Sequence, residues 1–186
     1  MYRDLDEQAL AMRCSQKDRL AGDELYRRYA VKVYTLCKRY LGDEDDAKDL
    51  MLDTLVQALD KIDTYRYMGE GSLGRWIGKI AINKALSQIR KQRWLIIPLD
   101  GWMKDKIPEP REEEMETIPG EKIQEWIAEL PGLRRAVFNL YCLDGYSHQE
   151  IGKMLGISER GSTSTLAKAR RQLKEKIRQY LKERDK

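Results

Sequence analysis

Apolar residues recur at three- and four-residue steps along most of this chain, which is the spacing of one face of a helix. The first repeat runs from Leu5 to Leu41, the second covers residues 43–62 and the third covers residues 73–90. Strand-like alternation is weak throughout, so the pattern predicts an all-α fold. The predicted inward-facing residues are Leu20, Leu25, Tyr29, Val33, Leu36 and Tyr40, then Ala47, Leu50, Met51, Leu55, Ala58, Leu59 and Ile62, then Leu73, Trp76, Ile77, Ile80 and Ala81.

The helical repeat stops between residues 94 and 120. This stretch holds four of the five prolines of the chain, and proline both fixes φ and lacks the amide donor that a helix needs. We therefore predict a linker over residues 94–120, joining a first small domain at 1–93 to a second at 121–186. The spacing in the second domain predicts helices over residues 121–130, 133–143, 148–155 and 159–182.

The net charge of +4 is distributed unevenly along the 186 residues. Residues 1–93 carry 18 basic and 15 acidic side chains, a net +3, and residues 121–186 carry 14 and 9, a net +5. The linker carries 3 basic and 7 acidic side chains, a net −4. The chain therefore has two basic domains joined by an acidic linker, and any proposed function must account for this charge distribution.

Cysteine and histidine usage argues against a metal site. The cysteines Cys14, Cys37 and Cys142 are widely spaced without a CxxC pair, and His148 is the single histidine. We therefore expect reduced thiols, no zinc and no cofactor. The N-terminus has no apolar signal core, and no run approaches the ~20 residues of a membrane span, so we expect a cytoplasmic protein without membrane insertion.

The second domain contains a helix-turn-helix pattern. Ser147 and Glu150 form a capping box at the start of one helix, and Gly156 can adopt the left-handed turn that ends it. Gly152 is small where a second helix must cross closely, and Ser158 can cap that second helix. In this layout the second helix lies in the DNA major groove.

The helix that follows Ser158 is basic and begins with short hydroxyl side chains, which suit phosphates and base edges. An ordinary helical hairpin with a solvated basic face has the same charge, but the cap, glycines and basic helix in this order favour DNA binding. His148 lies just inside a helix start, and we expect it to face solvent. The hydroxyls are Ser162, Thr163, Ser164 and Thr165, and the first basic residues are Arg160, Lys168, Arg170 and Arg171.

The first domain contains a second candidate for nucleic-acid binding, at residues 65–93. Two tyrosines and a glycine loop precede Trp76, and basic residues follow it; the body of Trp76 is expected to be buried. Aromatic side chains beside a positive groove are how proteins hold unpaired bases. Asn83 has both a donor and an acceptor, as base reading requires.

An acidic run opens the helix predicted over residues 43–62. Acids in a first helical turn are favoured by the helix dipole, and this interpretation outweighs a metal cage. Leu52 and Val56 lie off the main apolar stripe, beside Asp49 and Asp53. An exposed apolar spot among carboxylates is typical of a protein-binding surface.

Taken together, these features resemble an alternative sigma factor of the extracytoplasmic-function (ECF) group in the sigma-70 family. The resemblance covers about residues 23–93 and 124–182. It rests on three stretches in this order and spacing: LYRRYAVKVYTLCKRYLGDEDDAKDLMLDTL, YMGEGSLGRWIGKIAINKAL and ELPGLRRAVFNLYCLDGYSHQEIGKMLGIS.

The resemblance implies that residues 1–93 are sigma region 2 and residues 121–186 are sigma region 4. Helix 43–62 would then dock on the clamp helices of the largest subunit of core RNA polymerase, while other contacts reach the flap region. Loop 65–72 and helix 73–90 would capture and help melt the minus-ten element of promoter DNA. The helix starting at Ser158 would read the minus-35 element, and the acidic linker would thread near the active-site and RNA-exit cleft.

The residues to which the resemblance gives these roles fall into three sets. The polymerase-binding set is Asp46, Asp49, Leu52, Asp53 and Val56; the minus-ten set is Tyr65, Tyr67, Arg75, Trp76, Lys79, Asn83 and Lys84; the minus-35 set is Ser158, Arg160, Ser162, Thr163, Thr165, Lys168 and Arg171. Members of this group have no catalytic activity of their own. Two-domain members are commonly held by an anti-sigma factor, although no residue here identifies one.

The sequence departs from the family pattern at several of these positions. The family often has Gln where Leu52 stands, a charged residue where Thr163 or Thr165 stands, and a branched apolar residue where Ser162 stands. Gly161 lowers the helix propensity of this segment by ~1 kcal/mol relative to Ala.

Two alternative functions stay open from the residues alone. A conventional helix-turn-helix regulator would act without polymerase, but such proteins commonly dimerise, and we find no sustained heptad for that purpose. An enzyme acting on nucleic acid could use the carboxylates from Asp43 to Asp53. It would lack a histidine or lysine placed to assist them.

Overall fold

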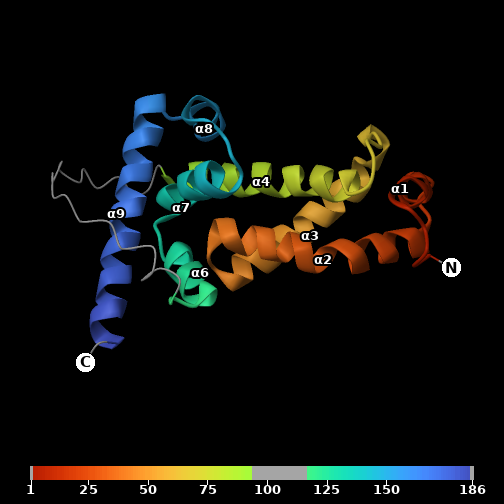
Figure 1. The fold of residues 1–186 in the computed structure, drawn as a ribbon. Coiled ribbons are helices and arrows are strands. Elements are labelled where there is room, and N and C mark those ends of the chain that lie inside the picture. Colours follow the sequence, from red (N-terminus) through yellow and green to blue (C-terminus); the bar gives the residue numbers. More distant parts are fainter. Residues whose placement is uncertain (1, 94–116, 185–186) are drawn as a thin grey trace. The chain divides into compact units, whose positions relative to one another are not determined.

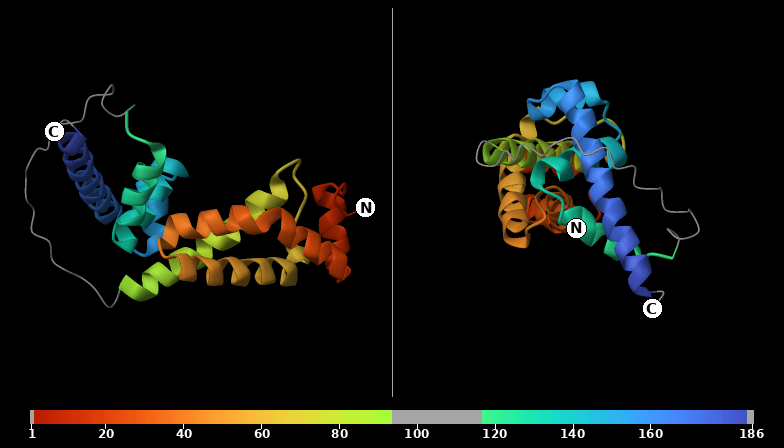
Figure 2. Two further views of the ribbon diagram at one scale, coloured as in Figure 1. Left: turned by 90° about the horizontal axis from the view of Figure 1, so that it is seen from below. Right: turned by 90° about the vertical axis from the view of Figure 1, so that its left-hand side faces the viewer.

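The computed structural model describes residues 2–93 and 117–184, and every regular element in these two ranges is helical. The predicted linker lies outside the described residues except for its last four positions. The chain divides into two compact units, Met1–Ala85 and Leu86–Lys186, and the division falls within helix α4 (Ser72–Arg93). Figures 1 and 2 show the helices of both units.

The first unit consists of α1 (Glu7–Ser15), α2 (Arg19–Leu41), α3 (Glu44–Asp60), the short 3-10 helix η1 (Ile62–Thr64) and the first part of α4. α2 and α3 lie side by side as an antiparallel pair (Figure 1). Aspartates cap each of the first three helices: the side chains of Asp6, Asp18 and Asp43 accept hydrogen bonds from first-turn N–H groups.

The core of the first unit largely follows the predicted apolar stripes. Leu25, Tyr29, Val33 and Tyr40 of α2 are buried. Leu20 was wrongly placed in this stripe: it is exposed, and Ala21 is buried instead. Ala21 lies four residues before Leu25 and eight before Tyr29 in the same helix, so Ala21 shares their buried face and Leu20 does not.

The second unit contains α6 (Gly120–Ala128), α7 (Gly132–Phe138), η2 (Asn139–Leu143), α8 (His148–Leu155) and α9 (Glu159–Arg184). One α-helix was predicted over residues 133–143, but its second half, η2, is a π-helix. α7, α8 and α6 all pack on α9, which is the long helix seen in Figure 1. One cluster of the core joins α6 to α9 through Ile118, Trp126, Leu130, Ala169, Leu173 and Ile177.

Candidate functional site

The outer face of α3 exposes two apolar side chains among carboxylates, as the sequence predicts. Leu52 is 48% exposed and Val56 is 58% exposed, and they lie one helical turn apart. Asp46, Asp49 and Asp53 are exposed as well. Helix α3 therefore presents an apolar spot of two residues with an acidic border. We call these five residues the α3 face.

The loop between η1 and α4 is held by hydrogen bonds at its base. The hydroxyl groups of Tyr65 and Ser72 lie 2.6 Å apart, and the Met68 N–H donates to Ser72 Oγ over 3.2 Å. Gly69 and Gly71 have φ values of 91° and 77°, which favour glycine. The result is a loop with an ordered base and an exposed tip.

Aromatic residues of this region divide into a buried support and an exposed tip. Tyr65 is buried, and its ring packs at a tilt against Trp76 with 5.6 Å between ring centroids. Trp76 is partly buried, as predicted for the body of its ring. Tyr67 is exposed, and Met68 is 81% exposed. Tyr65 and Trp76 therefore support the loop, while Tyr67 and Met68 present its surface.

Polar and basic side chains continue this surface along α4. Arg75, Lys79 and Asn83 are exposed and are spaced four residues apart, so they lie on one side of the helix. Lys84 is partly exposed, and its Nζ lies 3.6 Å from a carboxylate oxygen of Asp53 on α3. We call Tyr67, Met68, Arg75, Lys79 and Asn83 the loop–α4 surface.

The helix-turn-helix geometry predicted for the second unit is confirmed. Ser147 and Glu150 form the capping box of α8, and Gly156 ends α8 with a left-handed φ of 65°. A Cβ on Gly152 would lie 2.8 Å from the Ile157 carbonyl oxygen, so only glycine fits there without a shift. Ser158 Oγ accepts the Gly161 N–H over 3.0 Å and caps α9.

The residues predicted to contact DNA from α9 differ in exposure. Arg160 and Thr163 are exposed, and Thr165, Lys168 and Arg171 are partly exposed. The Thr163 hydroxyl also donates to the Glu159 carbonyl oxygen over 3.2 Å. These five residues, together with the capping Ser158, form what we call the α9 surface.

Ser162 does not belong to this surface. It is completely buried, and its Oγ lies 2.9 Å from His148 Nδ1. The expectation that His148 faces solvent was wrong, because its ring is partly buried and stacks on Tyr141 with 4.4 Å between centroids. Ser162, predicted from the sequence to contact DNA, is thus a buried, hydrogen-bonded residue between α8 and α9.

Sequence reasoning also missed three residues that organise these surfaces. Met68 was passed over although it is the most exposed large apolar residue among those described. Ser72 fixes the base of the loop, and Glu7 contacts the start of α4 from α1. No local sequence pattern indicates the contact of Glu7 with α4, because the two meet only through tertiary packing.

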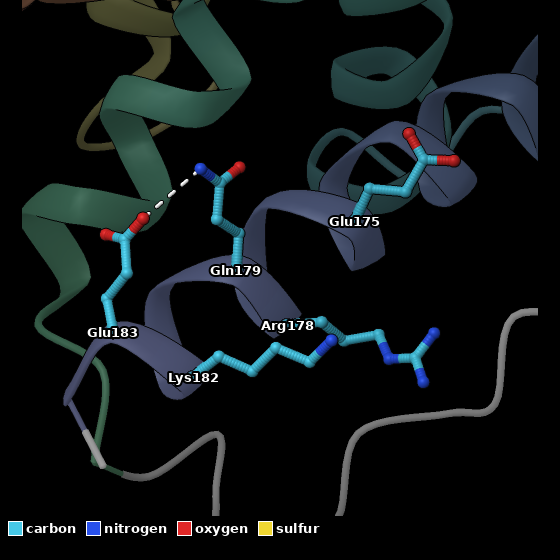
Figure 3. A pocket seen from close by; sticks show the side chains of 5 residues that line it. All are labelled: Glu175, Arg178, Gln179, Lys182 and Glu183. Atoms are coloured by element: carbon cyan, nitrogen blue, oxygen red, sulfur yellow. Dashed lines mark hydrogen bonds between the residues drawn. The ribbon is translucent and has the colours of Figure 1, made fainter. Parts of the chain in front are cut away.

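The C-terminal half of α9 carries a hollow of mixed charge next to the α9 surface, since Arg171 Nε lies 4.0 Å from a carboxylate oxygen of Glu175. It is lined by Glu175, Arg178, Gln179, Lys182 and Glu183 (Figure 3). The Gln179 amide donates to Glu183 over 3.2 Å, while Arg178 and Lys182 extend to a different side of the helix. Since two acidic and two basic side chains line it, the hollow lacks the single charge sign of an anion site.

Residues 2–93 and 117–184 contain no cluster of three or more His, Cys, Asp or Glu side chains arranged to hold a metal ion. None of the helices in these ranges combines the length and apolar character needed to cross a membrane.

Comparison with known proteins connects both units to one family. The model of sigma-70 region 2 matches residues 25–95, and the model of sigma-70 region 4 matches residues 120–173. The chain therefore belongs to the sigma-70 family. Its relatives include ECF sigma factors, and it is a member of that group.

Two relatives illustrate the range of these matches. The ECF RNA polymerase sigma factor SigE of Mycolicibacterium smegmatis is 29% identical over 168 residues, which cover 87% of this chain and 63% of SigE. The RNA polymerase sigma factor YlaC of Bacillus subtilis is 27% identical over 165 residues, which cover 87% of this chain and 94% of YlaC. The chain thus spans less than two thirds of SigE but nearly all of YlaC.

The solved structures that match this chain in part include the sigma factor RpoE from Bartonella quintana, crystallised with the anti-sigma factor NepR. Its TM-score is 0.48 at 20% sequence identity, and the match covers 81% of this chain and 92% of that chain.

Proposed function

We propose that this chain binds core RNA polymerase and directs promoter-specific transcription initiation as an ECF-type sigma factor. The observation that carries the proposal is the pairing of two sigma-type units in one chain, each with a surface suited to a different part of a promoter. Residues 1–93 act as region 2, residues 121–186 act as region 4, and residues 94–120 link them. The role is regulatory rather than catalytic.

The α3 face is the proposed contact with the clamp helices of the polymerase largest subunit. Exposed Leu52 and Val56 lose contact with water on docking, which is the main favourable term in protein association. Asp46, Asp49 and Asp53 form a rim that favours a basic partner and steers its approach. The proposal extends to a contact of the second unit with the flap region.

The loop–α4 surface is the proposed minus-ten contact, together with Lys84. A base leaving the DNA stack costs a few kcal/mol, and an aromatic side chain that stacks on it returns ~1–3 kcal/mol. Tyr67 supplies an exposed ring, while Tyr65 and Trp76 hold the loop from beneath. Arg75 and Lys79 neutralise phosphates, and Asn83 reads a base edge.

The α9 surface is the proposed minus-35 contact. Basic Arg160, Lys168 and Arg171 bind phosphates, which fixes the register of the helix in the major groove and makes binding depend on salt. Thr163 and Thr165 have short side chains whose hydroxyl groups can hydrogen-bond to base edges when the helix lies in the groove. Because two small surfaces share the DNA contacts and polymerase provides the rest, DNA binding by the free protein is weak.

A binding experiment separates this function from that of a conventional helix-turn-helix regulator. A sigma factor co-elutes with purified core polymerase in gel filtration without DNA, whereas a regulator elutes alone and binds duplex DNA by itself. The nuclease alternative is weakened by the placement of Asp43, whose carboxylate accepts the N–H groups of Asp45 and Asp46 at the start of α3. An Asp49→Ala variant with undiminished cleavage activity would exclude the carboxylate of Asp49 as a catalyst.

A further inference from the structure

Helix α4 begins without a capping side chain of its own. The Arg75 N–H donates to the Gly71 carbonyl oxygen over 3.1 Å, so Gly71 occupies the N-cap position just before Ser72. Glycine has no side-chain oxygen to accept a first-turn N–H, and α4 has no acidic residue in its first turn. An acceptor for this helix start must come from elsewhere in the fold.

Glu7 of α1 supplies that acceptor from 66 positions earlier in the chain. The Leu73 N–H donates to Glu7 Oε2 over 3.0 Å, and the Tyr29 hydroxyl donates to Glu7 Oε1 over 2.8 Å. Both carboxylate oxygens are therefore engaged, one by α4 and the other by α2. A negative charge at this position also interacts favourably with the positive end of the α4 dipole.

Tyr29 restricts the same helix start from the other side. It is buried, and a Cβ on Gly74 would lie 3.2 Å from Tyr29 Cε1, so α4 and α2 cross closely here. Burial, followed by the hydrogen bond to Glu7, raises the pKa of Tyr29 well above its ordinary value. The phenol consequently stays protonated and remains a donor to Glu7.

The N-terminal segment that carries Glu7 is itself anchored to α2. Arg28 donates to the carbonyl oxygens of Leu5 and Tyr2 over 2.7 and 2.9 Å, and its Nε contacts the buried carboxylate of Glu24. Leu10 of α1 is completely buried. Glu7 therefore acts from a fixed support and not from a loose N-terminal arm.

We infer that Glu7 is a positioning residue for promoter opening, although it lies outside the region 2 match at residues 25–95. By fixing Leu73, it holds the adjacent Ser72, whose hydroxyl organises the loop through Tyr65 and Met68. Glu7 itself touches no DNA. The inference rests on the proposed function, because it assigns the loop to the minus-ten contact.

Amide hydrogen exchange of the free, full-length protein tests the contact without polymerase. Glu7→Ala should speed exchange of the Leu73 and Met68 amides by about fivefold, the effect of losing a helix cap. Glu7→Gln should cause a smaller change, since its amide oxygen still accepts a hydrogen bond. Gln8→Ala, a neighbouring exposed position, should leave both rates unchanged. Unchanged rates in Glu7→Ala would overturn the inference.

Open-complex formation with core polymerase tests the role. Glu7→Ala should lower opening of duplex promoter DNA by about tenfold, as expected when a cap and a charge are lost together, while core affinity stays within about twofold. Glu7→Gln should recover part of the loss. A parallel fall in core affinity would mean general damage and would overturn the positioning role. If wild-type protein opened no promoter, the proposed function would fail, while the exchange data would still decide the contact.

Discussion

His148 and Ser162 join the two helices of the helix-turn-helix: His148 Nδ1 in the first turn of α8 lies 2.9 Å from Ser162 Oγ in the first turn of α9. Ser162 is completely buried, and the Tyr141 ring stacks on the face of the imidazole. A polar contact therefore links the first turns of α8 and α9 through a buried hydroxyl.

Replacing His148 by alanine should destabilise the second unit by about 1–3 kcal/mol, because the buried Ser162 hydroxyl loses its partner and the Tyr141 ring loses its stack. The measurement is urea unfolding of the full chain, monitored through the NMR signals of the backbone amides in α8 and α9. Gln149→Ala, at the next and exposed position, is the control and should change the free energy of unfolding by less than about 0.5 kcal/mol. Equal effects of both changes would contradict the role of the contact.

Replacing Leu52 by arginine should weaken binding to core polymerase by about tenfold or more, because it places a charge in the apolar centre of the α3 face. Fluorescence titration of labelled protein with core enzyme gives the dissociation constant. The matched control is Leu20→Arg on α2, where a leucine that is 57% exposed, against 48% for Leu52, is replaced. If the Leu52 variant bound as tightly as the control, the α3 face would be an ordinary solvated surface.

Replacing Asn83 by alanine should impair promoter opening more than polymerase binding. Asn83 is exposed on α4, so its loss leaves the core of the first unit intact, and its proposed partner is a base edge. Opening can be followed with 2-aminopurine in the minus-ten element, next to a separate measurement of core affinity. We expect opening to fall by about tenfold, the lower range for one bidentate base contact. Equal losses in both assays would refute the separation of the two surfaces.

The stability of the first unit should fall in acid through Glu24. Hydrogen bonds from Arg27 and then Arg28 lower the pKa of this buried carboxylate from 4.5 to about 2. A lowered folded-state pKa stabilises the fold above the unfolded value of 4.5 and loses this effect as the pH falls toward 2. Urea midpoints of the wild type should therefore drop over this range, and Glu24→Gln should show a flatter pH dependence. A parallel pH dependence in both proteins would contradict this assignment.

Replacing Thr54 by valine should stabilise the first unit by about 1 kcal/mol. Thr54 is completely buried on α3, and its hydroxyl oxygen has no hydrogen-bond partner within residues 2–93 and 117–184. Valine fills the same space without a polar group to desolvate. The control is Thr35→Val on α2, where the hydroxyl is exposed and bonded to the Val31 carbonyl oxygen. A loss of stability in Thr54→Val would indicate that the hydroxyl is satisfied in solution.

Local patterns predicted the helices and the turn because their causes lie within a few residues of one another. The capping box at Ser147, the left-handed Gly156 and the exposed Leu52 each follow from short-range spacing. The π-helix at residues 139–143 was missed, since the side-chain period alone does not distinguish it from a continuing α-helix.

Contacts between residues far apart in the sequence could not be predicted from local patterns. Ser162 looks like a DNA-facing hydroxyl in the sequence, and only the crossing of α8 over α9 buries it. Tyr65 was placed in the minus-ten set as an aromatic beside a glycine loop, but it is buried beneath that loop against Trp76. Glu7 and Leu73 meet through tertiary packing, which no local pattern encodes.

Run-off transcription with purified core polymerase on a genomic promoter library tests the central claim most directly. The account predicts that adding this protein produces new transcripts from a limited set of start sites. The promoters of these transcripts should share a minus-ten and a minus-35 sequence at fixed spacing. A transcript pattern identical to that of core polymerase alone would contradict it.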